Sequence, residues 1–381
     1  MANEQNNLAA LAAFNLRLGF TAFGGPAAHI ALMEQEVVGR RGWFTKPEFL
    51  ELLGMVNLIP GPSSTQLAIF IGYRKAGWLG LLVAGCCFIF PAAAVTLALA
   101  YFYVRYGKVP ATGGLLHGLK PVVIAIILHA IWSLGRTAIS NVWRALLAVA
   151  AFAASLLGCN LLLVLLVAGL VSLTATMAAE KRQLSQLRQV LVPSALLFSA
   201  PEAAAKVVSI GAIFLRFLKL GAVVFGSGYT LVAFLRADLV DRTHWLTSQQ
   251  LLDAITVGQI TPGPVFTTAT FIGFLLGGVR GATAATVAIF LPSFLMVAAG
   301  GILLPRLQKS RVFSAFIAGV STASLALMAA VLVQLTPDAL VDPLAWVLCL
   351  GSAFALFRYN LNSSILVAVG AAVGLASTWL R

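Results

Sequence analysis

The chain has 381 residues, of which 60% are hydrophobic and only 10% are charged. So little polar surface cannot cover a water-soluble globule, which excludes soluble enzymes and soluble binding modules and predicts a protein embedded in a membrane. The net charge of +13 is typical of Lys and Arg gathered in cytoplasmic loops, and no nucleic-acid-binding signature accompanies it, so we expect the lipid bilayer and no nucleic acid as a partner.

The first expected element is a long apolar helix from Leu8 to about Val38, which Gly24-Gly25-Pro26 interrupts near its middle. Gly24 and Gly25 allow a close approach of the backbone, either to a bound anion or to a neighbouring helix. Arg17 precedes Gly24 by seven residues, close to two helical turns, so both lie on nearly the same face. A cation there would neutralise a doubly charged anion; the alternative is that Arg17 extends to the nearest membrane surface.

The second expected element is a pair of short helices that meet at Pro60-Gly61-Pro62. Proline cannot continue the first helix, because it lacks the N–H group, whereas it suits the first position of the next one. The new helix would therefore begin inside the membrane, and the N–H groups of Ser63, Ser64 and Thr65 would lack acceptors within it. An anion is one natural acceptor, since a helix amino end also carries about half a positive charge. The alternative is a hairpin turn whose donors bond to neighbouring helices and water.

Two polar residues in the first of these helices are further candidates. Asn57 lies three residues before Pro60 and can hydrogen-bond either the interrupted carbonyls or the substrate. Glu51 lies nine residues before Pro60. It is a candidate carrier of a coupling proton, or an ordinary solvated acid at the outer end of a helix.

Four more apolar segments follow, near residues 78–104, 114–134, 142–157 and 159–179. Stretches of this length and hydropathy cross a hydrocarbon core of about 30 Å as helices. The four cysteines lie inside apolar segments without metal-ligand spacing, and we expect neither a metal nor a cofactor.

The chain contains the same pattern twice. A shift of 202 residues (262 − 60) places Trp43 on Trp245, Thr45 on Thr247 and Pro60-Gly61-Pro62 on Pro262-Gly263-Pro264. We therefore expect two homologous domains, residues 1–180 and 207–381, joined by a cytoplasmic linker at residues 181–206. The second-domain counterparts of the candidate residues are Lys219, Gly226, Ser227, Asp253, Gln259, Gly263 and Thr267. Val265 and Phe266 replace two of the three hydroxyl residues, so the first amino end is expected to be the better anion site.

The distribution of basic residues arbitrates between two topologies. If the hairpin at the Pro-Gly-Pro break re-enters the membrane, Arg40, Arg41, Arg74 and Lys75 gather on one side, as the positive-inside rule requires; if it crosses, they are divided between both sides. We predict an all-α polytopic membrane protein with two homologous inverted repeats, each of about five transmembrane helices plus a re-entrant helical hairpin broken at its Pro-Gly-Pro motif, and both termini outside. Inverted repeats built around broken helices are typical of transporters, with the site near the bilayer midplane.

The first-half run FGGPAAHIALMEQEVVGRRGWFTKPEFLELLGMVNLIPGPSSTQLAIFIGYRKAGWLG resembles the signature domain of the chromate ion transporter family, and FGSGYTLVAFLRADLVDRTHWLTSQQLLDAITVGQITPGPVFTTATFIGF resembles its second copy. The resemblance implies a long-chain, two-domain inner-membrane transporter that exports chromate and confers chromate resistance, with sulfate as the expected competitor. Gly24, Gly25, Asn57 and Pro60-Gly61-Pro62 match the family pattern. The second copy departs from it, with Gly226-Ser227-Gly228 in place of Gly24-Gly25-Pro26.

Two other functions stay open at this point. One is a carrier of the same fold for sulfate or another small anion. The other is a membrane-embedded enzyme, which we do not expect, because the sequence contains no HExxH, GxSxG or Walker motif. A homodimer is compatible with a transporter of this size.

Overall fold

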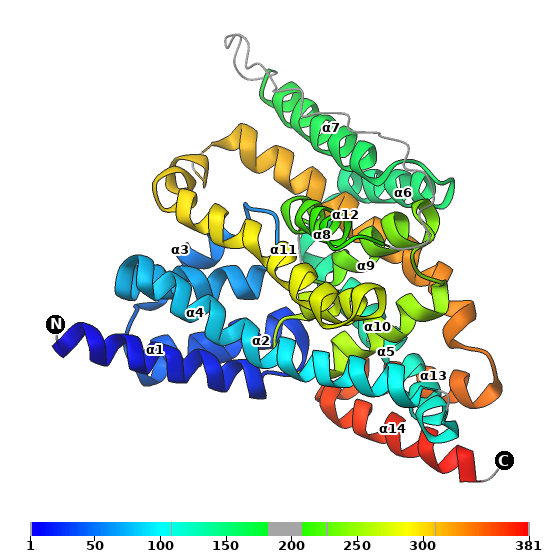
Figure 1. Cartoon of the computed structure of the whole chain (residues 1–381). Helices are drawn as coiled ribbons and strands as arrows, with labels where there is room; N and C mark the ends of the chain where they lie inside the picture. The colour runs from blue at the N-terminus through cyan, green and yellow to red at the C-terminus, as the bar shows by residue number, and fades with distance from the viewer. Residues whose placement is uncertain (1, 108, 182–207, 226–227, 309, 380–381) are drawn as a thin grey trace.

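The structure, a computed structural model, describes residues 2–107, 109–181, 208–225, 228–308 and 310–379 (Figure 1). Within these ranges all regular secondary structure is helical, which confirms the predicted all-α class. The expected linker at residues 181–206 lies outside the described residues, except for Lys181.

The two repeats contain the same succession of helices. The first comprises α1 (Ala2–Thr21), α2 (Gly25–Glu34), η1 (Gln35–Arg40), α3 (Lys46–Val56), α4 (Ser63–Tyr106), α5 (Pro110–Ala138), α6 (Val142–Leu156) and α7 (Leu161–Lys181). The second comprises α8 (Ile210–Val223), η2 (Gly228–Thr230), α9 (Leu231–Leu235), η3 (Arg236–Arg242), α10 (Ser248–Ile260), η4 (Val265–Thr267), α11 (Thr268–Gln308), α12 (Arg311–Ala339), α13 (Pro343–Tyr359) and α14 (Ser363–Trp379).

Matched capping boxes fix where the third helix of each repeat begins. The Thr45 side chain accepts a hydrogen bond from the Glu48 N–H, and the Glu48 carboxylate accepts one from the Thr45 N–H. Thr247 and Gln250 form the same pair at the start of α10. Each box satisfies two backbone donors that no helical carbonyl can reach.

The first element of each repeat is a helical hairpin, which corrects the prediction of one long interrupted helix. The Arg41 guanidinium lies 5.9 Å from the centre of the Phe14 ring. In a continuous helix these residues would be about 40 Å apart, at 1.5 Å per residue. The break after α1 is therefore where predicted, but α2 and η1 fold back along α1. In the second repeat an ion pair between Arg216 and Asp238, 3.2 Å apart, closes the equivalent hairpin.

The second element of each repeat is the predicted hairpin at the Pro-Gly-Pro break. The backbone of α4 leaves helical geometry at Ala76 and Gly77, so its first arm ends there. The Lys75 ammonium at this end lies 5.3 Å from the centre of the Trp43 ring, close to where α3 begins. The α3 helix and the first arm of α4 therefore enter and leave at the same face, which we call the Arg40 face. The second arm of α4 runs to the opposite face.

Equivalent helices of the two repeats run in opposite directions. His117, near the start of α5, lies 3.0 Å from Asp342, just after the end of α12. At the other end of α5, the Ala138 carbonyl accepts a hydrogen bond from the Thr322 hydroxyl, with 3.4 Å between the oxygens. Because α5 and α12 occupy the same place in their repeats and pack antiparallel, the repeats are inverted.

Five helices in the described ranges are long and apolar enough to cross a membrane, and the protein is a multi-pass membrane protein. Because α1 and α2 form a hairpin, the start of α1 lies at the Arg40 face. The prediction that both termini lie opposite this face is therefore wrong for the amino terminus. Figure 1 shows the two termini at opposite ends of the helix bundle.

Large aromatic side chains are buried in the core of each repeat. Phe70 and Phe88 are less than 2% exposed in the first repeat, as are Phe266 and Phe271 in the second. In the first repeat, Phe70 and Phe88 belong to one buried cluster with Leu11, Met33 and Phe49, so this packing holds the two hairpins together.

Candidate functional site

The helix breaks of both repeats meet at one junction between the repeats. The Gly61 N–H donates a hydrogen bond to the Val224 carbonyl, at 2.7 Å. The Gly263 N–H donates one to the Ala22 carbonyl, at 2.9 Å. The two bonds are related by the repeat, so each Pro-Gly-Pro break binds the first break of the other repeat.

Only glycine fits the centre of either Pro-Gly-Pro break. Gly61 has φ +123° and Gly263 has φ +87°, backbone conformations that side chains rarely adopt. A Cβ on Gly61 would lie 2.8 Å from the Ser293 Oγ in α11, and one on Gly263 would lie 2.7 Å from the Ala92 Cβ in α4. The long helices of both repeats therefore pack directly against the breaks.

His29 links the first break to the amino end of α4. Its Nδ1 lies 3.3 Å from the Ser64 Oγ, and its Nε2 lies 3.1 Å from the Ala22 carbonyl oxygen. A carbonyl can only accept, so Nε2 carries the proton and Nδ1 accepts from the Ser64 hydroxyl. Sequence reasoning missed this role because His29 has no counterpart in the second repeat. Its position one turn after the glycine break was the available signal.

The amino end of α4 contains a buried hydroxyl without a hydrogen-bond partner. Ser63, Ser64 and Thr65 are all buried, and Thr65 is fully so. Within the described residues, the Thr65 Oγ1 and the Gln66 Oε1 have no hydrogen-bond partner, while the Gln66 Nε2 donates to the Pro60 carbonyl. The Thr65 hydroxyl is thus a donor available to an acceptor at the amino end of this helix.

The matching end in the second repeat is built differently. Val265–Thr267 forms a 3₁₀ turn before α11 begins. The Thr267 hydroxyl donates to the Pro264 carbonyl at 2.9 Å, and the Thr268 hydroxyl donates to the Val265 carbonyl at 2.8 Å. These hydroxyls are already used within their own turn, so the two amino ends are chemically unequal.

Candidate residues from different repeats share one cavity beside the junction. A cavity of about 290 Å³ is lined by Gly24, Gln259 and Ser364, among others. The Gln259 Nε2 and the Ser364 Oγ are buried without a hydrogen-bond partner in the described part of the chain. The Tyr229 hydroxyl packs against Gly25, across the repeat interface. Tyr229 was missed by sequence reasoning, because the first repeat has Ala27 at that position.

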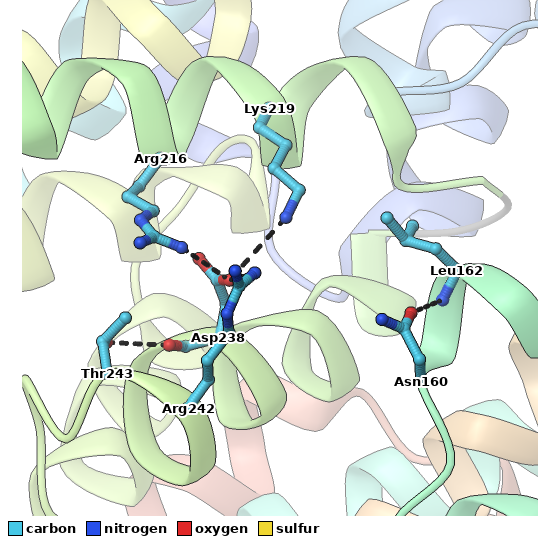
Figure 2. A network of polar contacts seen from close by, with 7 residues as sticks. All are labelled: Asn160, Leu162, Arg216, Lys219, Asp238, Arg242 and Thr243. Carbon is cyan, nitrogen blue, oxygen red and sulfur yellow. Dashed lines mark hydrogen bonds and ion pairs between the residues drawn. The ribbon is translucent and has the colours of Figure 1, made fainter. Parts of the chain in front are cut away.

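The remaining described candidates are exposed side chains or belong to a separate polar cluster. Arg17 is exposed on α1, and its charge acts on Glu36. Lys219 lies 3.9 Å from Asp238 in a separate polar cluster (Figure 2). Asn57 is exposed at the carboxyl end of α3, and Glu51 is exposed on the same helix. Gly226 and Ser227 lie outside the described residues.

Asp253 forms a buried ion pair that joins the repeats. The Lys120 Nζ of α5 lies 2.7 Å from the Asp253 Oδ1 of α10. The Tyr103 hydroxyl donates to the other carboxylate oxygen, also at 2.7 Å. The Lys120 and Asp253 side chains are only 8% and 6% exposed, so this carboxylate is held by two groups of the first repeat, unlike its exposed counterpart Glu51.

The described residues contain no group of three or more His, Cys, Asp or Glu placed to hold a metal ion. What the junction does offer is hydrogen-bond donors, from the amino end of α4 and from the Thr65 hydroxyl group. These are groups that bind anions.

Comparison with known proteins identifies the family. The model of the family described as "Chromate transporter" matches residues 9–173 and 211–375, two regions with the same 202-residue spacing as the repeat. The chain belongs to the chromate transporter family. No solved structure matches it.

Relatives named for chromate transport cover most of the chain. A probable chromate transport protein of Synechococcus elongatus is 33% identical over 88% of this chain and 86% of its own length. The chromate transport protein of Cupriavidus metallidurans is 31% identical over 96% of this chain and 92% of its own length. That of Pseudomonas aeruginosa is 30% identical, over 84% and 79% respectively.

Proposed function

We propose that this protein is a secondary transporter that exports chromate across the inner membrane. Membership of the chromate transporter family supports chromate as the substrate. The observation that carries the site is the junction, where both Pro-Gly-Pro breaks contact the opposite repeat through Gly61 and Gly263. Sulfate, a tetrahedral dianion of similar shape, is the expected competitor.

In this proposal the anion binds at the amino end of α4. Its first-turn N–H groups have no acceptor within the helix, and the buried Thr65 hydroxyl has no hydrogen-bond partner among the described residues. Hydrogen bonds from neutral donors to an anion are stronger than those to a neutral acceptor, which favours a doubly charged oxyanion here. The amino end of α11, whose hydroxyls bond to their own turn, contributes less.

The amino end of α4 is closed in this conformation, since Ser64 and Thr65 are 2% and 0% exposed. Binding from either face therefore requires the hairpins of the two repeats to separate. Inverted repeats suit this movement, because an opening at one face has a structural counterpart at the other. The proposed cycle alternates the opening between the two faces around Gly61 and Gly263.

Export also agrees with the electrical gradient across the membrane. The Arg40 face carries Arg40, Arg41, Lys46, Arg74 and Lys75, and the positive-inside rule makes it cytoplasmic. An inside-negative potential acts on each charge with about 2.3 kcal/mol per 100 mV, so a dianion gains roughly 4 to 5 kcal/mol on leaving. Exposed Glu51 and buried Asp253 remain candidates for carrying a coupling proton.

Chromate flux in everted membrane vesicles tests this proposal. Vesicles that contain the protein should accumulate radiolabelled chromate when the lumen is positive, and unlabelled sulfate should reduce the uptake. Vesicles without the protein are the control. Equal chromate uptake by both kinds of vesicle would contradict export, and labelled sulfate accumulating in preference to chromate would favour a sulfate carrier.

A further inference from the structure

A second polar site lies at the mouth of the first hairpin of the second repeat. A cavity of about 520 Å³ is lined by α8, α9, η3 and α12 and by the turn that joins α6 to α7. Because the repeats are inverted, this mouth lies at the face opposite Arg40. Val223 lines the cavity, and the next residue, Val224, accepts the hydrogen bond from Gly61 at the central junction. The cavity thus lies between the junction and the opposite face.

One carboxylate in this site is shared by three cations (Figure 2). The Asp238 Oδ1 lies 3.2 Å from Arg216 Nη1, 3.7 Å from Arg242 Nη1 and 3.9 Å from Lys219 Nζ. The four groups carry a net charge of +2. The Asp238 and Arg216 side chains are only 9% and 13% exposed, whereas the Lys219 and Arg242 side chains that line the cavity are 38% and 40% exposed.

Arg236 adds two guanidinium donors to which no described residue hydrogen-bonds. Its side chain is 15% exposed, and its Nε lies 3.9 Å from the Asp241 Oδ1, beyond hydrogen-bonding distance. The Arg236 Nε and Nη1 are buried without a hydrogen-bond partner among the described residues. A buried guanidinium N–H without an acceptor is costly, and an oxyanion is the acceptor that matches its geometry.

The amino end of α7 also faces this cavity. Leu161 and Leu162 line it, and the Asn160 Oδ1 accepts the Leu162 N–H at 3.0 Å (Figure 2). The amino end of a 21-residue helix contributes further positive potential. The cavity therefore has cationic groups on the hairpin side and a helix amino end on the other side.

Comparison with the first repeat shows which charges of this cluster occur in both repeats and which occur only in the second. Lys219, Asp238 and Arg242 correspond to Arg17, Glu36 and Arg40 of the first repeat. Arg216 and Arg236, however, occupy the positions of Phe14 and Glu34. Two arginines whose side chains are 13% and 15% exposed are thus specific to the second repeat, at the mouth away from the Arg40 face.

We propose that this cavity is an anion vestibule, which binds a small doubly charged oxyanion between the central junction and the outer face. Its assignment to the exit path rests on the proposed function as an exporter. Its affinity for anions does not depend on the direction of transport: it rests on Arg236, on the Lys219 and Arg242 cations around the shared Asp238 carboxylate, and on the amino end of α7. An anion released from the junction would bind Arg236 and Lys219 before it reaches water.

Cys159 provides a native probe of this cavity, because it lines the cavity and is exposed. A variant that keeps only this thiol (Cys86→Ala, Cys87→Ala, Cys349→Ala) is reacted in intact cells with two membrane-impermeant methanethiosulfonates, one bearing a sulfonate and one a trimethylammonium group. For each thiol we take the ratio of the rate with the sulfonate reagent to the rate with the trimethylammonium reagent. We expect this ratio to be about tenfold higher for Cys159 than for a free thiol in solution. Sulfate in the medium should slow this reaction.

Substitutions with opposite expected signs make the result specific. Arg236→Gln and Arg242→Gln should each reduce the preference for the sulfonate reagent and the protection by sulfate, whereas Asp241→Asn should increase the preference. Arg40→Gln, the repeat counterpart of Arg242, should change neither. Equal rates for the two reagents, absence of sulfate protection, or labelling only from the cytoplasmic face would overturn the vestibule. The readout involves no transport, so these results would leave the export proposal to be judged by chromate flux.

Discussion

Gly61 and Val224 are joined across the repeat interface by a backbone hydrogen bond of 2.7 Å, and Gly263 and Ala22 repeat the bond at 2.9 Å. Each re-entrant hairpin is thus fastened to the first hairpin of the other repeat. The hairpins cannot part at either face without disturbing one of these bonds. We infer that the pair of bonds stabilises the closed conformation and that transport requires at least one of them to break.

A side chain at Gly61 should abolish transport. Gly61→Ala introduces a Cβ 2.8 Å from the Ser293 Oγ, at a residue with φ +123°. We expect chromate uptake by everted vesicles to fall to background. Gly42→Ala is the matched control, because Gly42 also has positive φ but has open space around it. That variant should lose about 1 kcal/mol of stability and keep its transport. Equal transport by both variants would contradict the tight junction.

The buried Lys120–Asp253 pair should show strong coupling. Asp253→Asn leaves the Lys120 ammonium buried without its carboxylate, which costs about 3 to 5 kcal/mol. The double variant Lys120→Gln/Asp253→Asn should recover part of this loss, measured by unfolding in detergent micelles. Glu51→Gln, at the exposed counterpart of Asp253, should be neutral. Additive losses in the double variant would show that the two side chains do not interact.

The capping boxes should contribute to stability in both repeats. Thr45→Ala removes the acceptor for the Glu48 N–H at the start of α3 and should lower the free energy of unfolding by about 1 kcal/mol. Thr247→Ala should have a similar effect at α10. Thr174→Ala is a control, because the exposed Thr174 hydroxyl bonds only to a carbonyl of its own helix. Thermal unfolding in detergent measures all three, and an equal effect of Thr174→Ala would argue against the boxes.

The two termini should be accessible from different sides. The start of α1 lies at the basic Arg40 face, and α14 runs antiparallel to α5 and ends at the other face, where Thr378 packs against Gly114. A protease-sensitive tag on the amino terminus should be cleaved only in everted vesicles, and one on the carboxyl terminus only in intact spheroplasts. Cleavage of both tags from the same side would contradict the inverted arrangement described here.

The repeat and the re-entrant break could be predicted because they depend on local chemistry. A proline pair around Gly61 stops one helix and starts the next wherever it occurs, and the charges of Arg40, Arg41, Arg74 and Lys75 distinguish re-entry from crossing. The direction of α2 could not be predicted. A glycine break permits either a straight continuation or a return, and contacts distant in sequence, such as Arg41 with Phe14, select the return.

Part of the candidate site could also be predicted from local sequence patterns that recur in both repeats. Matching the repeats identified Gly61 and Gly263, because each Pro-Gly-Pro break is recognisable from its own sequence. It also matched Arg17 with Lys219, but it could not show their surroundings. Arg17 comes close to Glu36, and Lys219 to Asp238, only when each hairpin folds back. His29 and Tyr229 were missed because each occurs in one repeat only, and a search for matched residues cannot find them.

The central claim is that the amino end of α4 binds the transported oxyanion, and Thr65 tests it most directly. Thr65→Val keeps the shape of the side chain and removes a buried donor that has no partner in the described part of the chain. Thr267→Val alters the equivalent residue, whose hydroxyl bonds to its own turn. We expect chromate uptake by everted vesicles to fall about tenfold or more in Thr65→Val, since hydrogen bonds to charged groups contribute about 1.5 to 3 kcal/mol. Uptake by Thr267→Val should stay close to wild type. Wild-type uptake by a well-folded Thr65→Val protein would contradict the claim.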